Sequence, residues 1–204
     1  KILYFSIDNS IEKPAALVIS KESNYKNSMQ ILTGHTQNKV KDRIEVDYGV
    51  IGQKFWVRAK YRGPFNLNRD FSPDGYKNWE LWNFDVLELF LTRTDLRVPY
   101  IELQISPLNQ KLALLIKKPR KSFEFYTPAS FKYSTEFTGE FWNIYCELYV
   151  ADIPGSSHHL RGNIHCCLGP QENRRFYGLN INQDDKADFH KPLNFISLGR
   201  FDER

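Results

Sequence analysis

The sequence predicts an all-β protein built as a β-sandwich. Aromatic residues make up 15% of its 204 residues, with 15 Phe and 11 Tyr but a single Met, and this bias favours strands over helices. Short strand-like segments recur along the chain between turn residues, and no window longer than ten residues carries a convincing helical period. Many short strands in one compact chain are typical of a sandwich.

Strand-like segments follow one another along the whole chain and are bounded by turn residues. The breakers between them include Gly63-Pro64, Gly155-Ser156-Ser157 and Gly169-Pro170, which interrupt regular structure. Short helical turns are expected around residues 151–153 and 194–197. The predicted strands are residues 1–7, 15–20, 42–46, 54–61, 86–92, 100–107, 112–117, 141–150, 162–168 and 176–180.

Alternation along these strands assigns a face to each side chain. One face is apolar, and the second faces of neighbouring strands collect polar residues, which form either a solvated surface or the floor of a binding groove. These polar residues are Glu88, Gln104, Asn163 and His165. The predicted core residues are Leu87, Leu89, Leu91, Ile101, Leu103, Ile105, Trp142, Ile144, Cys146, Leu148, Ile164, Cys166 and Leu168, with Trp56 also expected to be buried.

The strand over residues 86–92 holds a carboxylate inside an apolar run. Glu88 stands between Val86 and Phe90 on one face, and Trp82 lies just before the strand. A lone Glu in such a position is costly to bury unless a partner satisfies it. An aromatic ring beside a strand-borne carboxylate can hold a sugar, because the ring covers the apolar face and the acid accepts hydroxyl hydrogen bonds. The alternative is a core strand with a structural ion pair.

Composition excludes several classes of function. The net charge of +4 is spread along the chain, and the densest basic cluster, residues 117–121, contains Pro119 and is predicted to be a solvated turn, which disfavours nucleic-acid binding. No apolar run approaches the roughly 20 residues that span a bilayer. No signal peptide is visible, but the chain begins at Lys1, so we expect a processed or trimmed product.

Three cysteines do not make a disulfide framework. A bridge from Cys146 to Cys166 or to Cys167 stays open at this point. Zinc is not expected, because no Cys-x-x-Cys or His spacing completes a site.

An ordered set of motifs resembles family 9 carbohydrate-binding modules. The set spans roughly residues 50 to 201, and its closing Phe-His-x-Pro-x-x-Phe element is the most specific part. The resemblance implies a single module over residues 1–204 with a two-sheet antiparallel sandwich, immunoglobulin-like or jelly-roll in type. The motifs are Trp82…Asp85-x-x-Glu88-x-Phe90, Tyr100-x-x-Leu103-Gln104-Ile105-Ser106-Pro107, Gly162-Asn163-Ile164 and Phe189-His190-Lys191-Pro192-x-x-Phe195-x-x-Leu198.

The resemblance also implies a sugar site in which aromatic rings trap the ligand. Trp82 matches the first Trp of the clamp, and Glu88 matches the carboxylate that accepts sugar hydroxyls. Gln104 stands where the sugar binders have an Arg, so a charge-assisted contact becomes a neutral one. Phe189 stands where they have the second Trp, and it can stack with less area. Asn163 completes the polar floor, and His190 is placed to reach the groove.

Relatives of this kind bind structural calcium through loop oxygens, so the resemblance implies a possible calcium site on the acidic loop before Phe189. Its ligands would be Asp184, Asp185 and Asp188, because oxygen ligands on a turn suit calcium. The alternative is a solvated acidic turn. No cofactor is otherwise required.

The predicted function is non-catalytic binding of an oligo- or polysaccharide, with no nucleic-acid partner and no membrane insertion. The predicted location is secreted, periplasmic or cell-envelope, in or beside a glycan-degrading system. One alternative is a sandwich domain that has lost sugar binding, as the residues at positions 104 and 189 would allow. Another is a glycosidase that pairs Glu88 with Glu102 or Asp85. Trp79 could replace Trp82 as the stacking residue.

Overall fold

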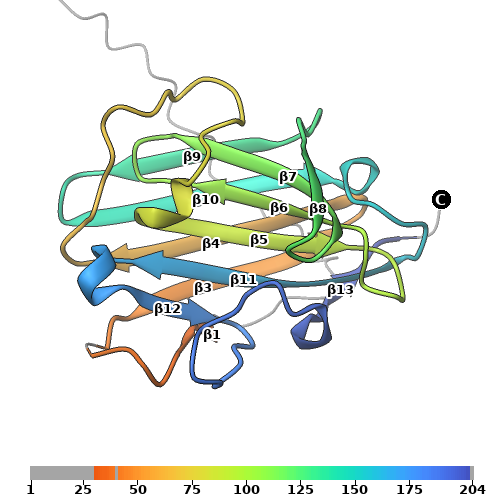
Figure 1. Cartoon of the computed structure of the whole chain (residues 1–204). Coiled ribbons are helices and arrows are strands. Elements are labelled where there is room, and N and C mark those ends of the chain that lie inside the picture. The colour runs from red at the N-terminus through yellow and green to blue at the C-terminus, as the bar shows by residue number, and fades with distance from the viewer. Residues whose placement is uncertain (1–29, 40, 203–204) are drawn as a thin grey trace, which may run out of the picture.

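The computed structural model describes residues 30–39 and 41–202, which form two antiparallel sheets packed face to face (Figure 1). This confirms the predicted all-β sandwich. The strands expected at residues 1–7 and 15–20 lie outside the described residues. No helix in the described part of the chain is long and apolar enough to cross a membrane.

The first sheet, called here the β3 sheet, has the strand order β1-β3-β4-β10-β9. The second, the β5 sheet, has the order β2-β12-β11-β5-β6-β7-β8, and β13 pairs with the first half of β11. The β3 sheet contains β1 (Gln30–Ile31), β3 (Ile44–Ile51), β4 (Lys54–Arg62), β10 (Phe141–Tyr149) and β9 (Lys132–Phe137). The β5 sheet contains β2 (Thr33–Gly34), β12 (Arg175–Gly178), β11 (His159–Leu168), β5 (Val86–Thr92), β6 (Tyr100–Ile105), β7 (Lys111–Lys118), β8 (Ser122–Phe125) and β13 (Ile196–Arg200).

The main core lies between the two sheets and is formed by the predicted inward faces. All thirteen alternation-derived core residues, from Leu87 to Leu168, are at most 3% exposed. Trp142 is buried as expected, whereas Trp56 is not in this core. Because the side chains of β4 alternate, Phe55 and Val57 point inward and Trp56 lies half-buried on the outer face.

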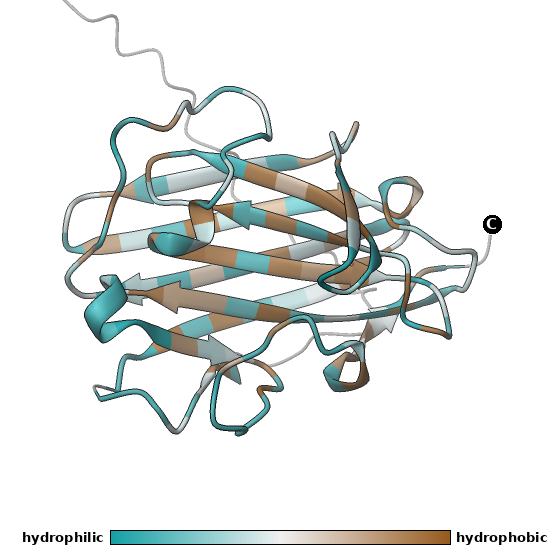
Figure 2. Ribbon diagram, in the orientation of Figure 1, coloured by the Kyte–Doolittle hydropathy of each residue, from teal (hydrophilic) through white to brown (hydrophobic). Residues whose placement is uncertain are grey.

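The outer face of the β5 sheet carries a second apolar cluster, so it is not a plain solvated surface. Val86, Phe90 and Tyr100 belong to this cluster together with Leu81 from the 3₁₀ turn η1 (Leu81–Asn83) and Phe195. All seven residues of β5 are therefore buried. Figure 2 shows hydrophilic segments within the otherwise apolar central strands of this sheet. The β7–β8 hairpin and the loop before β13 lie over parts of this face, which contains a cleft (Figure 1).

The structure corrects several predicted elements. The strands β1, β2, β8, β9 and β13 were not predicted. The turn expected at residues 194–197 is the 3₁₀ turn η4 (Pro192–Asn194), and β13 begins at Ile196. The turn expected at 151–153 is η2 (Val150–Asp152), and η3 (Gln171–Asn173) precedes β12. Cys146, Cys166 and Cys167 are buried free thiols, so the bridge left open by the sequence is not formed.

Candidate functional site

A cleft of about 460 Å³ lies on the outer face of the β5 sheet. In Figure 1 this face looks toward the viewer, with the β7–β8 hairpin and the loop before β13 in front of the strands. The volume falls within the usual range for small-molecule sites, roughly 300–1,000 Å³. The cleft is lined by Trp79, Trp82, Glu88, Phe90, Glu102, Gln104, Leu114, Ile116, Lys118, Arg120, Phe123, Cys167, Phe176, Ala187, Asp188, Phe189 and His190.

The floor of the cleft is polar and buried. Glu88 on β5 pairs in register with Gln104 on β6, and Glu102 lies two residues earlier on β6. The Gln104 amide Nε2 donates to Glu102 Oε1 at 2.6 Å. Glu102 Oε2 and Gln104 Oε1 are buried and have no hydrogen-bond partner among the described residues. A ligand with hydroxyl groups would satisfy both acceptors, and leaving them unmet is costly.

The pKa values of the two floor carboxyl groups are both raised above the ordinary value for glutamate. Burial raises the pKa of Glu88, and repulsion from the Glu102 carboxylate raises it further. Burial also raises the pKa of Glu102, against the lowering effect of the Gln104 amide. The Cys167 thiol donates weakly to Glu88 Oε2 at 3.7 Å. A protonated carboxyl group both donates and accepts, which matches sugar hydroxyls.

One wall of the cleft is aromatic. Trp79 stacks on Phe123 with ring centroids 5.3 Å apart and planes inclined by 17°. Trp79 also meets Trp82 edge to face at 4.8 Å. Trp79 is 42% exposed and Phe123 is 47% exposed, whereas Trp82 packs against the second apolar cluster. Trp79 and Phe123 therefore offer more open ring surface than the predicted Trp82.

The opposite wall is formed by the loop before β13. The Phe189 ring lies flat on the His165 imidazole, with centroids 3.7 Å apart, so one of its faces is already covered. His190 Nδ1 is 2.8 Å from the Tyr100 hydroxyl, and its Nε2 is 3.8 Å from Glu102 Oε2. Burial lowers the pKa of both His165 and His190, so both rings favour the neutral form at neutral pH.

Five of the six predicted sugar-site residues line the cleft, and Asn163 does not. The Asn163 side chain donates to the Asn180 carbonyl at 2.5 Å and accepts from the Asn180 N–H at 3.2 Å. Its amide therefore anchors the segment after β12 instead of facing a ligand. The sequence interpretation named Glu102 only as a partner of Glu88 in the glycosidase alternative, although it lies two residues before Gln104 on the same strand and lines the cleft. It also missed Phe123, because β8 was not predicted.

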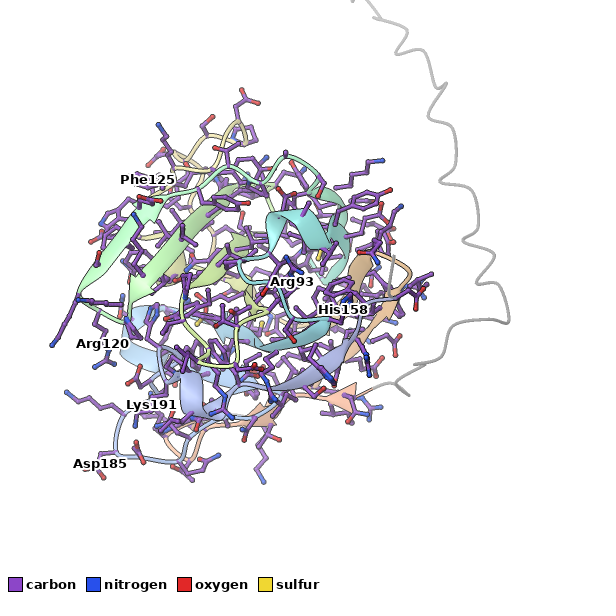
Figure 3. All side chains as sticks on the ribbon, turned by 90° about the vertical axis from the view of Figure 1, so that its right-hand side faces the viewer. Arg93, Arg120, Phe125, His158, Asp185 and Lys191 are labelled. Carbon is purple, nitrogen blue, oxygen red and sulfur yellow. The ribbon has the colours of Figure 1, made fainter. Side chains whose placement is uncertain are left out.

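The three predicted metal ligands do not form a ligand set. Asp184 forms an ion pair with Lys191, and Asp188 Oδ1 lies 2.8 Å from Arg120 Nη2. Asp185 is exposed, and Figure 3 shows it at the edge of the molecule. Within residues 30–39 and 41–202, no group of three or more His, Cys, Asp or Glu side chains is arranged to hold a metal ion. Calcium binding at this loop stays a prediction.

Solved structures with the same fold include carbohydrate-binding modules. A Bacteroides uniformis protein proposed to bind carbohydrate matches with a TM-score of 0.69 at 13% identity, over 86% of each chain. A family 9 carbohydrate-binding module from Caldicellulosiruptor kristjanssonii in complex with cellotriose matches with a TM-score of 0.59 at 11% identity, over 87% of this chain and 83% of the module. A family 9 module from the same organism in complex with glucose gives 0.55 at 10% identity, over 85% of each chain. The chain thus has the fold that the motif order predicted.

Sequence comparison adds one curated relative. The mouse UPF0462 protein C4orf33 homolog is 29% identical over 130 residues, which are 58% of this chain and 65% of the mouse protein. The chain therefore spans just under two thirds of the length of that relative. No family model matches the chain.

Proposed function

We propose that this protein binds a saccharide in the cleft on the β5 sheet and does not catalyse its conversion. The observation that carries the proposal is the pairing of exposed aromatic rings with a floor whose buried acceptors, Glu102 Oε2 and Gln104 Oε1, have no hydrogen-bond partner among the described residues. Solved proteins of the same fold bind cellotriose and glucose, which supports the same ligand class here.

The proposed mode of binding divides the ligand between wall and floor. The apolar face of a sugar ring stacks on Trp79, Phe123 or Trp82, and its hydroxyl groups reach Glu88, Glu102 and Gln104. Few hydrogen bonds and one or two stacked rings give a weak complex, roughly micromolar to millimolar in Kd. Phe189 and His190 would close the far side of the ring.

The two floor acids support a binding role better than a glycosidase role. Such enzymes place two carboxyl groups on either side of the scissile bond. Glu88 and Glu102 rise from adjacent strands of one sheet face, so both meet a bound ligand from the same side. A binding role therefore fits the pair better than an acid and base role. Chromatography of oligosaccharides after incubation with the protein would reveal cleavage products if the catalytic alternative held.

Titration calorimetry against glucose, cellobiose, xylobiose, galactose and short mixed glycans tests the proposal. Trp79→Ala should weaken binding of any ligand found by about five- to thirtyfold, because a stacked ring contributes about 1–2 kcal/mol. Trp82→Ala should also weaken binding. Because Trp82 packs on the second apolar cluster, the melting temperature of this variant must be measured to separate lost binding from lost stability. Tyr149→Ala is the matched control, since Tyr149 is 39% exposed and does not line the cleft.

A second candidate is a sandwich domain that has lost sugar binding and serves interaction or structure. The coverage of one Phe189 face by His165 favours it, because the ring then has only one face for a ligand. Absence of measurable binding to every ligand of the panel, in a protein that melts cooperatively, would support this candidate and reject the sugar site. The secreted or envelope location stays a prediction under either candidate.

A further inference from the structure

The lip of the cleft at the β7–β8 turn is strongly basic. Lys117, Lys118, Arg120 and Lys121 fall within five residues, and Lys118 and Arg120 line the cleft itself. Figure 3 shows the Arg120 side chain projecting outward on the same side of the molecule as Phe125 of β8. The solvated turn predicted from the sequence is thus part of the candidate binding site.

Acidic partners neutralise only part of this charge. Lys117 Nζ pairs with Glu124 at 2.6 Å, and Arg120 pairs with Asp188 at 2.8 Å. Lys118 and Lys121 have no ion-pair partner in the part of the chain that the structure describes. The turn therefore keeps two uncompensated positive charges, and one of them, on Lys118, faces the cleft.

Arg120 also keeps donors for a ligand. Its contact with Asp188 involves Nη2, and its side chain is 64% exposed. A guanidinium carries five N–H donors in a planar fork that matches carboxylate and similar anions. Lys118 and Arg120 lie two residues apart, so together they present a compact cationic pair at the cleft entrance.

The two acids on the floor repel an anionic ligand less than two ionised carboxylates would. Burial raises the pKa of both Glu88 and Glu102, and repulsion from Glu102 raises that of Glu88 further, so the floor holds less negative charge than two exposed carboxylates would. Asp188 is already held by Arg120. The charge that a ligand meets at the entrance is therefore set mainly by the lip.

We propose that the cleft selects acidic saccharides, in which a ring stacked on Trp79 or Phe123 carries an anionic substituent that Lys118 and Arg120 bind. The proposal rests on the sugar-binding function proposed above and adds the class of ligand. Phe123 pairs with Ile116 on β7, two residues before Lys118, so the exposed ring and the cationic pair belong to the same hairpin. A ligand can thus contact both at once. The anionic group is a carboxylate or a sulfate, and the test separates the two.

The test compares ligands that differ only in charge. One arm uses an oligogalacturonate and its full methyl ester, and the other uses a carrageenan oligosaccharide, whose only anionic groups are sulfates, and its desulfated form. We expect the anionic member of one pair to bind about fivefold more tightly than its control, which is what a partly exposed ion pair supplies. Raising the ionic strength to about 1 M shortens the Debye length to roughly 3 Å and should remove that advantage.

Two variants of the same turn make the assignment specific. Lys118→Gln should lower affinity for the preferred anionic ligand about fivefold and leave affinity for the neutral form of that ligand unchanged. Lys121→Gln removes the same charge from the same turn but outside the cleft lining, so its effect should be small.

The outcomes separate this inference from the function on which it rests. Equal affinity for the charged and neutral members, with a loss in Trp79→Ala, would overturn the acidic ligand and keep the sugar site. Equal effects of Lys118→Gln and Lys121→Gln would overturn the direct contact. Absence of binding to both pairs and also to the neutral panel of the proposed function, in folded protein, would overturn the sugar site as well.

Discussion

Replacing Glu88 by glutamine should change how the stability of the protein depends on pH. The substitution keeps the shape of the side chain and removes a buried group that titrates. Burial and repulsion from Glu102 raise the pKa of Glu88 above its value in the unfolded chain. The folded protein therefore keeps a proton that the unfolded chain releases above about pH 4.5.

The sign and size of the effect follow from this linkage. The contribution of Glu88 to the free energy of unfolding is fully present below the unfolded pKa and is lost as the pH rises toward the folded pKa. The loss is about 1.4 kcal/mol per pH unit for one retained proton. Between pH 5 and pH 7 the Glu88→Gln variant should gain about 2–3 kcal/mol relative to the wild type.

Urea unfolding at pH 5, 6 and 7, followed by tryptophan fluorescence, measures this difference. Asp85, whose pKa burial raises to about 6, contributes to both proteins and cancels in the comparison. Glu140→Gln is the control, because Glu140 is exposed and its side chain has no ion-pair partner among the described residues. Parallel profiles for Glu88→Gln and the wild type would refute a raised Glu88 pKa.

Two further substitutions test the packing that positions the site. Gly162→Ala would place a Cβ 2.0 Å from the Phe90 carbonyl oxygen on β5. We therefore expect the free energy of unfolding, measured by heat or urea, to fall by about 3 kcal/mol or more. Gly75→Ala should cause a smaller loss, because its Cβ meets nothing within 4 Å. Asp42→Ala leaves the buried Arg175 guanidinium without its carboxylate, 2.5 Å away in the native protein, and should cost about 3–5 kcal/mol. Glu45→Ala, which breaks the exposed Arg43–Glu45 pair, should cost under about 1 kcal/mol in the same assay.

Alternation predicted the core because it is a local property of a strand. The strand over residues 86–92 was right at both ends, and its three leucines point into the core as assigned. The short edge strands β8 and β9 escaped the same test. β9 reads Lys-Tyr-Ser-Thr-Glu-Phe and β8 reads Ser-Phe-Glu-Phe, and both lie at sheet edges, where few side chains need to be apolar.

The site residues also divide into those that a local strand pattern reveals and those that depend on contacts between distant segments. Glu88 and Gln104 were found because each is a polar residue on a strand that is otherwise apolar. Asn163 satisfied the same criterion, but its amide is used by Asn180, a contact that no alternation pattern encodes. Phe123 reaches the cleft only because β8 folds back over β7, so its role depends on a hairpin that the sequence pattern did not reveal.

The buried acids on the floor of the cleft lower the stability of the sheet that carries them. Glu88 and Glu102 lie among apolar residues on their strands, and each residue is only 3% exposed. Apolar residues of similar volume in place of buried charged groups are often neutral or stabilising, and polar residues that break a local rule are expected at functional sites. A Glu88→Leu variant should therefore be at least as stable as the wild type at pH 7 and should lose its ligand. A variant that is more stable and still binds would show that the acids are not part of the sugar site.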